Sequence, residues 1–221
     1  MTASAGASRP EPAAFRPFHH RILLLTSLAF FGNGIDASVM SFALPGMTRE
    51  WQLAPADVAL VLPMLGVGQL IGAIVVGSLV DRVGRRLSFA LTSALAGVGI
   101  GLSSLATGPL MLTALVFAGG IGFGGVAPAA GSIVSEFAPP SYRGRMLVWT
   151  QIFWVMGWSL AATMGGWFEQ VLGWRGILAL GALPIAIGLL SWLTVPESPR
   201  YLIARGRRAE AERAAETLRR R

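Results

Sequence analysis

Residues 77–86 read Gly-Ser-Leu-Val-Asp-Arg-Val-Gly-Arg-Arg, and the charged part of this segment separates two long apolar stretches. Asp81 follows directly on an uncharged stretch that we expect to be helical. A carboxylate at the C-terminus of a helix is disfavoured by the helix dipole, so we expect Asp81 to need a cationic or N–H partner. Gly84 permits a tight turn, and Arg85 and Arg86 place two positive charges directly after it.

The apolar stretches around this segment are long enough to cross a membrane, which takes about 20 predominantly apolar residues in a helix. Runs with no charged residue, or with one in the first run, occupy residues 22–48, 58–80, 87–135, 146–168 and 176–195. The third run is long enough for two helices, and Thr107-Gly108-Pro109 is typical of a hairpin between them. We predict an all-α membrane protein with six transmembrane helices over residues 22–195, preceded by a flexible tail, residues 1–21, and followed by a linker helix, residues 196–221.

The composition argues against a soluble catalytic domain. Of the 221 residues, 53% are hydrophobic and 13% are charged, with a mean hydropathy of +0.61, whereas a soluble domain carries roughly 25% charged residues. The chain has no cysteine, and its two histidines, His19 and His20, are adjacent in the tail. No disulfide or thiolate metal site is therefore available, and we expect neither a metal nor a cofactor.

All 18 basic residues are arginine, and their distribution predicts the orientation of the chain in the membrane. Six spans place both tails on one side, together with the loop between spans two and three and the loop between spans four and five. That side carries 16 of the 18 arginines, and the other side carries only Arg49 and Arg175. We predict a multi-pass protein of the cell membrane with both termini cytoplasmic. Because the arginines fit this topology, the basic excess does not indicate a nucleic-acid partner.

The full G-x-L-x-D-R-x-G-R-R pattern resembles the signature loop of the major facilitator superfamily of secondary transporters. Its defining positions here are Gly77, Asp81, Arg82, Gly84, Arg85 and Arg86. Two later segments resemble the sugar-porter and metabolite-permease branches of that superfamily. They are Glu136 with Arg143 after a glycine-rich fourth span, and Pro196-Glu197-Ser198-Pro199-Arg200 after the sixth span. The segments 33–36, 153–158 and 173–175 are similar to those of bacterial permeases for aromatic acids, including nicotinate-type transporters.

This resemblance implies the N-terminal six-helix half of a major facilitator fold, built from two inverted three-helix repeats. A faint internal echo agrees with inversion, because Gly166, Glu169, Gly173 and Arg175 follow span five as glycine, acid, glycine and arginine follow span two. In relatives the signature loop serves a cytoplasmic gate whose partners lie on a second half. A second six-helix half, from the same gene or a partner chain, is therefore an expected partner.

Asp36 is the only acidic residue well inside a predicted span, and an ionisable group at that depth is costly and typical of functional sites. Proton carrying or substrate coordination would suit a carboxyl there. A carboxyl near the outer mouth of the bundle that simply reaches water is the alternative. No arginine lies inside any predicted span, so Asp36 has no cationic partner within the chain. We expect Asp36 to be protonated and hydrogen-bonded at rest.

Asn33, Gln151 and Trp154 join Asp36 as candidates for the path of a substrate or of protons. Amide side chains are expensive to bury without a partner, and Trp154 lies within one helical turn of Gln151, where its ring can stack on an aromatic substrate. Ordinary packing or an interfacial aromatic belt is the alternative for such tryptophans.

Taken together, these features predict a secondary active transporter, or the N-terminal half of one. It would move a small organic metabolite, such as an aromatic or other organic acid, across the bilayer by alternating access, with proton coupling through Asp36. A sugar-type facilitator and a non-transporting half-molecule that requires a partner half are the alternatives. We do not expect an enzyme, because the predicted spans hold one deep Asp and no His or Cys.

Overall fold

The structure is a computed structural model that describes residues 17–220, with side chains as far as Ala214. Every regular element in this range is a helix. In chain order the helices are α1 (Pro17–Trp51), α2 (Pro55–Val83), α3 (Arg85–Ser103), α4 (Pro109–Phe137), α5 (Arg143–Leu180), α6 (Leu183–Thr194), α7 (Pro199–Ala204) and α8 (Arg208–Arg220).

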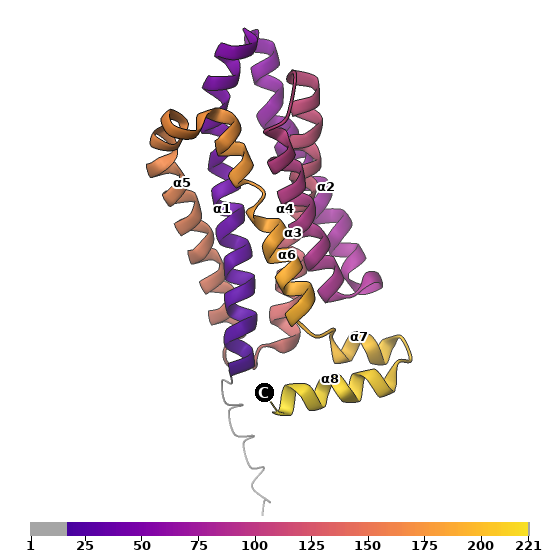
Figure 1. The fold of residues 1–221 in the computed structure, drawn as a ribbon. Helices are drawn as coiled ribbons and strands as arrows, with labels where there is room; N and C mark the ends of the chain where they lie inside the picture. The colour runs from indigo at the N-terminus through magenta and orange to yellow at the C-terminus, as the bar shows by residue number, and fades with distance from the viewer. Residues whose placement is uncertain (1–16, 221) are drawn as a thin grey trace, which may run out of the picture.

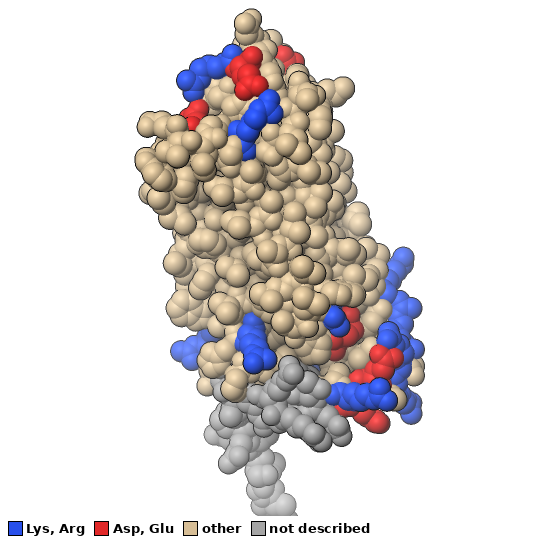
Figure 2. Space-filling model, viewed as in Figure 1, with Lys and Arg blue, Asp and Glu red and all other residues tan. Residues whose placement is uncertain are grey.

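Helices α1 to α6 form an up-and-down bundle, and α7 and α8 lie across one end of it (Figure 1). We call this the basic end, because Arg82, Arg85 and Arg86 flank the turn between α2 and α3 there. The opposite end, which carries Arg49 and Arg175, is the far end. Figure 2 shows charged side chains gathered at the two ends, with a broad band free of Asp, Glu, Lys and Arg between them on the visible face. This distribution is typical of a helical bundle that spans a bilayer.

Five helical segments among the described residues are long and apolar enough to cross a membrane, and the fifth is residues 143–194 taken as one. Gly173 interrupts that fifth segment with a φ of +65° and a ψ of 172°, outside the helical region. The chain turns back there at the far end, so that α5 and α6 run in opposite directions (Figure 1). The fifth segment therefore holds two passes, which correspond to the fifth and sixth predicted spans.

Glycines set the closest approaches between helices. A Cβ on Gly72 of α2 would lie against the backbone carbonyl of Ile121 on α4, and a Cβ on Gly124 would lie against that of Gln69. A Cβ on Gly157 of α5 would meet the carbonyl of Phe31 on α1 in the same way. Small residues at such crossings allow backbones to pack directly, as is common between membrane helices.

Two apolar clusters fill the bundle at different heights. The cluster at the basic end includes Phe18, Ile22, Phe89, Ile133, Met146 and Val195. The cluster at the far end includes Met40, Met47, Val61, Ile100, Leu112 and Leu178. On α1 the buried residues Asn33 and Asp36 lie between the two clusters, and on α4 the glycine-rich residues 119–125 lie between Val116 and Val126. The middle of the bundle is therefore built from small and polar residues.

Two boundaries differ from the predicted ones. Residues 17–21, predicted to lie in the tail, are helical and belong to α1, and Phe18 packs into the cluster at the basic end. The rest of the predicted tail, residues 1–16, lies outside the described residues. The predicted linker helix over residues 196–221 is two helices, α7 and α8, because Gly206 adopts a φ of +73° between them.

Candidate functional site

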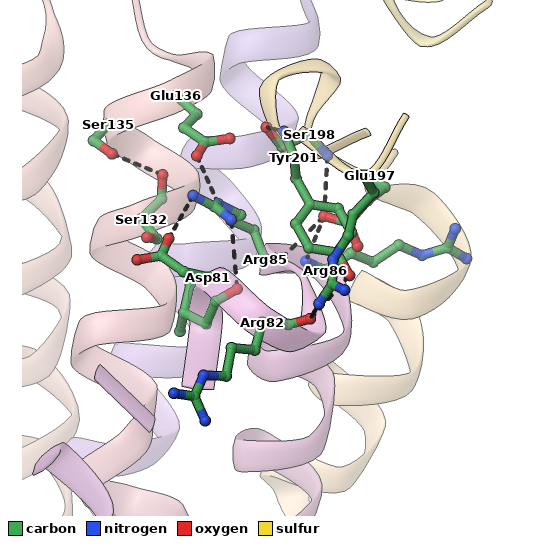
Figure 3. Close-up of polar contacts among 12 residues, drawn as sticks. Asp81, Arg82, Arg85, Arg86, Ser132, Ser135, Glu136, Glu197, Ser198 and Tyr201 are labelled. Carbon is green, nitrogen blue, oxygen red and sulfur yellow. Dashed lines mark hydrogen bonds and ion pairs between the residues drawn. The ribbon is translucent and has the colours of Figure 1, made fainter. Parts of the chain in front are cut away.

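The turn between α2 and α3 depends on Gly84, whose φ of +104° lies in a region that favours glycine. The turn brings Arg85, at the start of α3, close to the end of α2. Arg85 Nη2 donates to Asp81 Oδ1 at 2.7 Å, and Arg85 Nε donates to Glu136 Oε1 on α4 at 2.6 Å (Figure 3). The prediction that Asp81 needs a cationic partner is confirmed, and that partner is Arg85.

The two ion pairs of Arg85 differ in their exposure to water. The side chains of Arg85 and Glu136 are 14% and 9% exposed, whereas that of Asp81 is 76% exposed. Charges attract more strongly where water is excluded. The contact with Glu136 is therefore the stronger of the two, and it joins the start of α3 to the end of α4.

Glu197, from the segment after α6, caps the N-terminus of α3. Its Oε1 accepts hydrogen bonds from the backbone N–H groups of Arg85 at 2.9 Å and Arg86 at 3.4 Å. The first N–H groups of a helix lack partners within the helix, and the helix dipole favours an anion there. A Cβ on Gly84 would lie 2.6 Å from Glu197 Oε2, so the turn also needs glycine for this carboxylate to approach.

The first turns of α7 attach to the same loop. Ser198 Oγ caps α7 by accepting a hydrogen bond from the Tyr201 backbone N–H at 3.3 Å. The hydroxyl of Tyr201 donates to the backbone carbonyl of Arg82 at 3.2 Å (Figure 3). Arg205 Nη2 donates to the same carbonyl. Sequence reasoning did not identify Tyr201 or Arg205. The local pattern of Ser198 followed by a proline signals a helix start, but it does not reveal the distant loop that this helix contacts.

Other residues of the motifs lie outside this network. No atom lies within 4 Å of a Cβ built on Gly77, so that position faces outward. Arg143 Nε and Glu136 Oε2 are buried, and neither has a hydrogen-bond partner among the described residues. Pro199 starts α7, with Pro196 half-buried before it and Arg200 exposed after it. The structure therefore unites the signature loop with Glu136 and Glu197, but not with Arg143 or Arg200.

Asp36 and Asn33 lie one turn apart on α1 and are both buried, at 2% and 4% exposure. Within the described part of the chain, neither carboxyl oxygen of Asp36 has a hydrogen-bond partner, and the same holds for Oδ1 of Asn33. The expected hydrogen bond of Asp36 is therefore absent among the described residues. Polar groups buried without partners are costly, and such groups are typical of functional positions in membrane proteins.

Gln151 and Trp154 occupy a different position from Asp36. Gln151 is exposed and lines a shallow groove on α5 with Val148, Ile152 and Val155, while Trp154 is half-buried. The backbone of Trp154 packs against α1, since a Cβ on Gly34 would meet its carbonyl group. No hydrogen bond among the described residues joins either side chain to Asp36 or Asn33.

A second polar network lies at the far end. Glu50, near the end of α1, accepts hydrogen bonds from Trp174 Nε1 at 2.6 Å and from Arg175 Nη2 at 2.9 Å. Arg175 Nη1 also donates to the backbone carbonyls of Ser104 and Ala106, each at 3.0 Å, at the end of α3. An ion pair of 2.8 Å joins Arg49 to Glu169 nearby. The sequence pattern draws attention to Arg49, Glu169 and Arg175 but does not predict their pairing.

Comparison with known proteins decides the family. A family model described as sugar (and other) transporter matches residues 27–221. This chain belongs to that transporter family. The niacin transporter NiaP of Acinetobacter baylyi is 32% identical over 96% of this chain and 48% of its own length. The 4-hydroxybenzoate transporter PcaK of Pseudomonas aeruginosa is 34% identical over 89% of this chain and 44% of its own length.

Solved structures of transporters share the fold. The proton:xylose symporter XylE, of the major facilitator superfamily, superimposes with a TM-score of 0.75 at 23% identity, over 90% of this chain and 49% of XylE. A bacterial homologue of the lysosomal transporter Spinster gives 0.76 at 22% identity, over 85% of this chain and 45% of its own. The chain spans about half the length of the curated relatives it matches. The predicted family and half of a major facilitator fold are confirmed.

Proposed function

We propose that this chain forms one half of a secondary transporter for a small organic metabolite of the aromatic-acid type. The observation that carries the proposal is the buried pair Asp36 and Asn33, which holds unpartnered polar atoms in the middle of an apolar membrane bundle. The relatives named for niacin and 4-hydroxybenzoate favour the aromatic-acid class. Family membership favours transport over catalysis.

In the proposed mechanism, Asp36 and Asn33 contribute one wall of the substrate path, and Gln151 and Trp154 contribute the rim of that wall on α5. Asp36 carries a proton or binds a polar group of the substrate. A carboxyl that is buried without a cation is costly unless another group forms a hydrogen bond with it. The loop network of Asp81, Arg85 and Glu136 holds the cytoplasmic ends of α2, α3 and α4 together while the bundle moves as one body.

A second six-helix half would complete the path. Outward-facing glycines on two helices support the presence of such a second half. No atom lies within 4 Å of a Cβ built on Gly66 or Gly77 of α2, or on Gly166 of α5. Small residues on an open face let another helix approach closely. We place the basic end, with both termini, in the cytoplasm.

A sugar-type substrate is the second candidate, because the family description names sugars and XylE shares the fold. Substrate uptake into proteoliposomes distinguishes an aromatic-acid transporter from a sugar transporter. Radiolabelled nicotinate, 4-hydroxybenzoate and xylose are offered to liposomes that carry the chain alone or with a second six-helix half. We expect saturable uptake of an aromatic acid only with both halves. Uptake of xylose alone would support the sugar alternative, and saturable uptake by the chain alone would contradict the need for a second half.

A further inference from the structure

A cavity of about 470 Å³ opens at the basic end between the start of α3, the end of α6 and the two helices α7 and α8. Its charged and aromatic lining residues include Arg86, Trp192, Glu197, Arg207, Glu210 and Arg213. The cavity is separate from the candidate path of Asp36 and from the ion pair of Arg85 with Glu136. Neither transport nor the loop network accounts for it.

Arg86 is held in this cavity by an aromatic ring. Its guanidinium carbon lies 4.4 Å from the ring centroid of Trp192, a cation–π distance. The Nε of Arg86 is buried and has no hydrogen-bond partner among the described residues. The stacking therefore fixes the guanidinium in position, which suits recognition of an anion by its terminal N–H groups.

Among the described residues, the charges that line the cavity sum to a positive value, because three arginines face two glutamates. Both glutamates are engaged. Glu197 accepts from the backbone of α3, and Glu210 accepts from Arg207 Nε at 2.7 Å and Nη2 at 2.6 Å. The hydrogen bond from Arg207 holds the pKa of the Glu210 carboxyl below its ordinary value. Glu210 is thus paired with Arg207, and Glu197 offsets one of the two remaining arginine charges, which leaves a net positive charge among the described lining residues.

The surface above the cavity is apolar. Helices α3 and α6 pack against each other there, since a Cβ on Gly188 would lie 2.8 Å from the carbonyl oxygen of Ala90. Their exposed residues toward this end include Leu91, Leu189 and Leu193, and Trp192 itself is 39% exposed. An exposed tryptophan at the last turn of a spanning helix is typical of the headgroup level of a bilayer. A ligand held at Arg86 can therefore extend alkyl chains along α3 and α6.

We propose that this cavity binds the phosphate of an anionic phospholipid, with Arg86 as the principal phosphate ligand and the acyl chains lying on the apolar face of α3 and α6. Arginine binds phosphate through paired, charge-assisted hydrogen bonds. Basic pockets beside membrane helices at the cytoplasmic surface are suited to such headgroups. This inference is independent of the transported substrate.

The test uses the full chain in dodecyl maltoside micelles, titrated with dioleoyl phosphatidylglycerol or dioleoyl phosphatidylcholine, with bound lipid counted by native mass spectrometry. We expect one phosphatidylglycerol to bind about tenfold more tightly than phosphatidylcholine, and Arg86→Gln to remove about that factor. Arg208→Gln is the matched control. It removes one arginine from α8 at a residue that does not line the cavity, and it should change the affinity less than about twofold.

A second variant and two competitors also test the proposed lipid site. If Arg86→Gln does not fold, Trp192→Leu keeps the net charge and removes the stacking that holds the guanidinium, and it should weaken phosphatidylglycerol binding while leaving phosphatidylcholine binding unchanged. Glycerol 3-phosphate and inorganic phosphate serve as competitors and should fail to displace the lipid at equal concentration. Equal binding of the two lipids, equal losses in Arg86→Gln and Arg208→Gln, or displacement by free phosphate at lipid-like affinity would each overturn the proposal.

Discussion

A single side chain, Arg85, joins three helix ends at the basic end of the bundle. It pairs with Asp81 from α2 and with Glu136 from α4, and its own backbone N–H at the start of α3 binds Glu197. The burial of each pair determines how much it contributes to stability. Removing one partner from a buried pair leaves an uncompensated charge, whereas exposed pairs contribute little.

Double-mutant cycles should therefore separate the buried pair from an exposed one. For Arg85→Gln with Glu136→Gln we expect a coupling of about 2 kcal/mol in the free energy of unfolding. For Arg49→Gln with Glu169→Gln, where the arginine side chain is 75% exposed, we expect about 0.5 kcal/mol or less. Chemical unfolding in mild detergent measures both cycles under one condition. A coupling of Arg49 with Glu169 as large as that of Arg85 with Glu136 would show that burial does not decide their strength.

Some of these contacts could be predicted from the sequence and others could not. The need of Asp81 for a cation follows from its place at a helix C-terminus, and a partner four residues away was within local reach. The bond from Glu197 to α3 spans more than a hundred residues, and no local pattern indicates it. The resemblance marked Glu197 as a motif residue without giving its role. Among the described residues the expected hydrogen bond of Asp36 is absent, and α1 alone could not predict this because it depends on the helices packed around it.

Some glycines of the bundle lie against the backbone of another helix, and others face outward. Gly66 and Gly72 lie on the same helix, α2. A Cβ on Gly72 would meet the backbone of Ile121 on α4, whereas a Cβ on Gly66 would meet nothing within 4 Å. The same substitution should therefore have opposite effects at the two positions.

We expect Gly72→Ala to destabilise the bundle by about 1–3 kcal/mol, because a backbone cannot move aside as a side chain can. Gly66→Ala should stabilise the chain by up to about 1 kcal/mol, since alanine restricts the unfolded chain and fits a helix. Thermal unfolding of both variants in the same detergent provides the comparison. If Gly72→Ala is as stable as Gly66→Ala, α2 and α4 do not cross as closely as described.

Local sequence alone does not predict every helix boundary. The reversal between the fifth and sixth spans was predicted from charge and apolar runs, and Gly173 places it at the far end. The division of the linker into α7 and α8 was missed, although Gly206 was visible as a helix breaker. The break at Gly206 accompanies the hydrogen bonds by which Tyr201 and Arg205 hold α7 against the carbonyl of Arg82. Only the folded chain shows these contacts.

Over the whole molecule, the two ends of the bundle carry related ion pairs. At the basic end Arg85 follows Gly84, which has a positive φ, and pairs with Glu136 at the end of α4. At the far end Arg175 follows Gly173, which also has a positive φ, and pairs with Glu50 at the end of α1. Inverted three-helix repeats place α1 and α4 in equivalent positions. The faint echo in the sequence is thus matched by equivalent contacts.

The absence of cysteine makes the orientation directly testable. Thr107→Cys places a thiol in the exposed loop at the far end, and Ser141→Cys places one in the exposed loop at the basic end. With a membrane-impermeant maleimide on intact cells, we expect Thr107→Cys to react at once and Ser141→Cys to react only after permeabilisation, as the arginine distribution predicts. The reverse order of labelling would place the termini outside the cytoplasm.

Substrate uptake measures whether Asp36 lies on the path of a transported metabolite, as we propose. Proteoliposomes carrying the chain with a second six-helix half are given radiolabelled nicotinate or 4-hydroxybenzoate at pH 5.5 to 8, with Asp36→Asn compared against the unaltered chain. Asp57→Asn is the control, because Asp57 lies at the exposed start of α2 and asparagine keeps an acceptor for the N–H of Ala54. We predict that Asp36→Asn lowers uptake at least about tenfold or abolishes its pH dependence, while Asp57→Asn does neither. Uptake by Asp36→Asn with the rate and pH dependence of the unaltered chain would contradict the account.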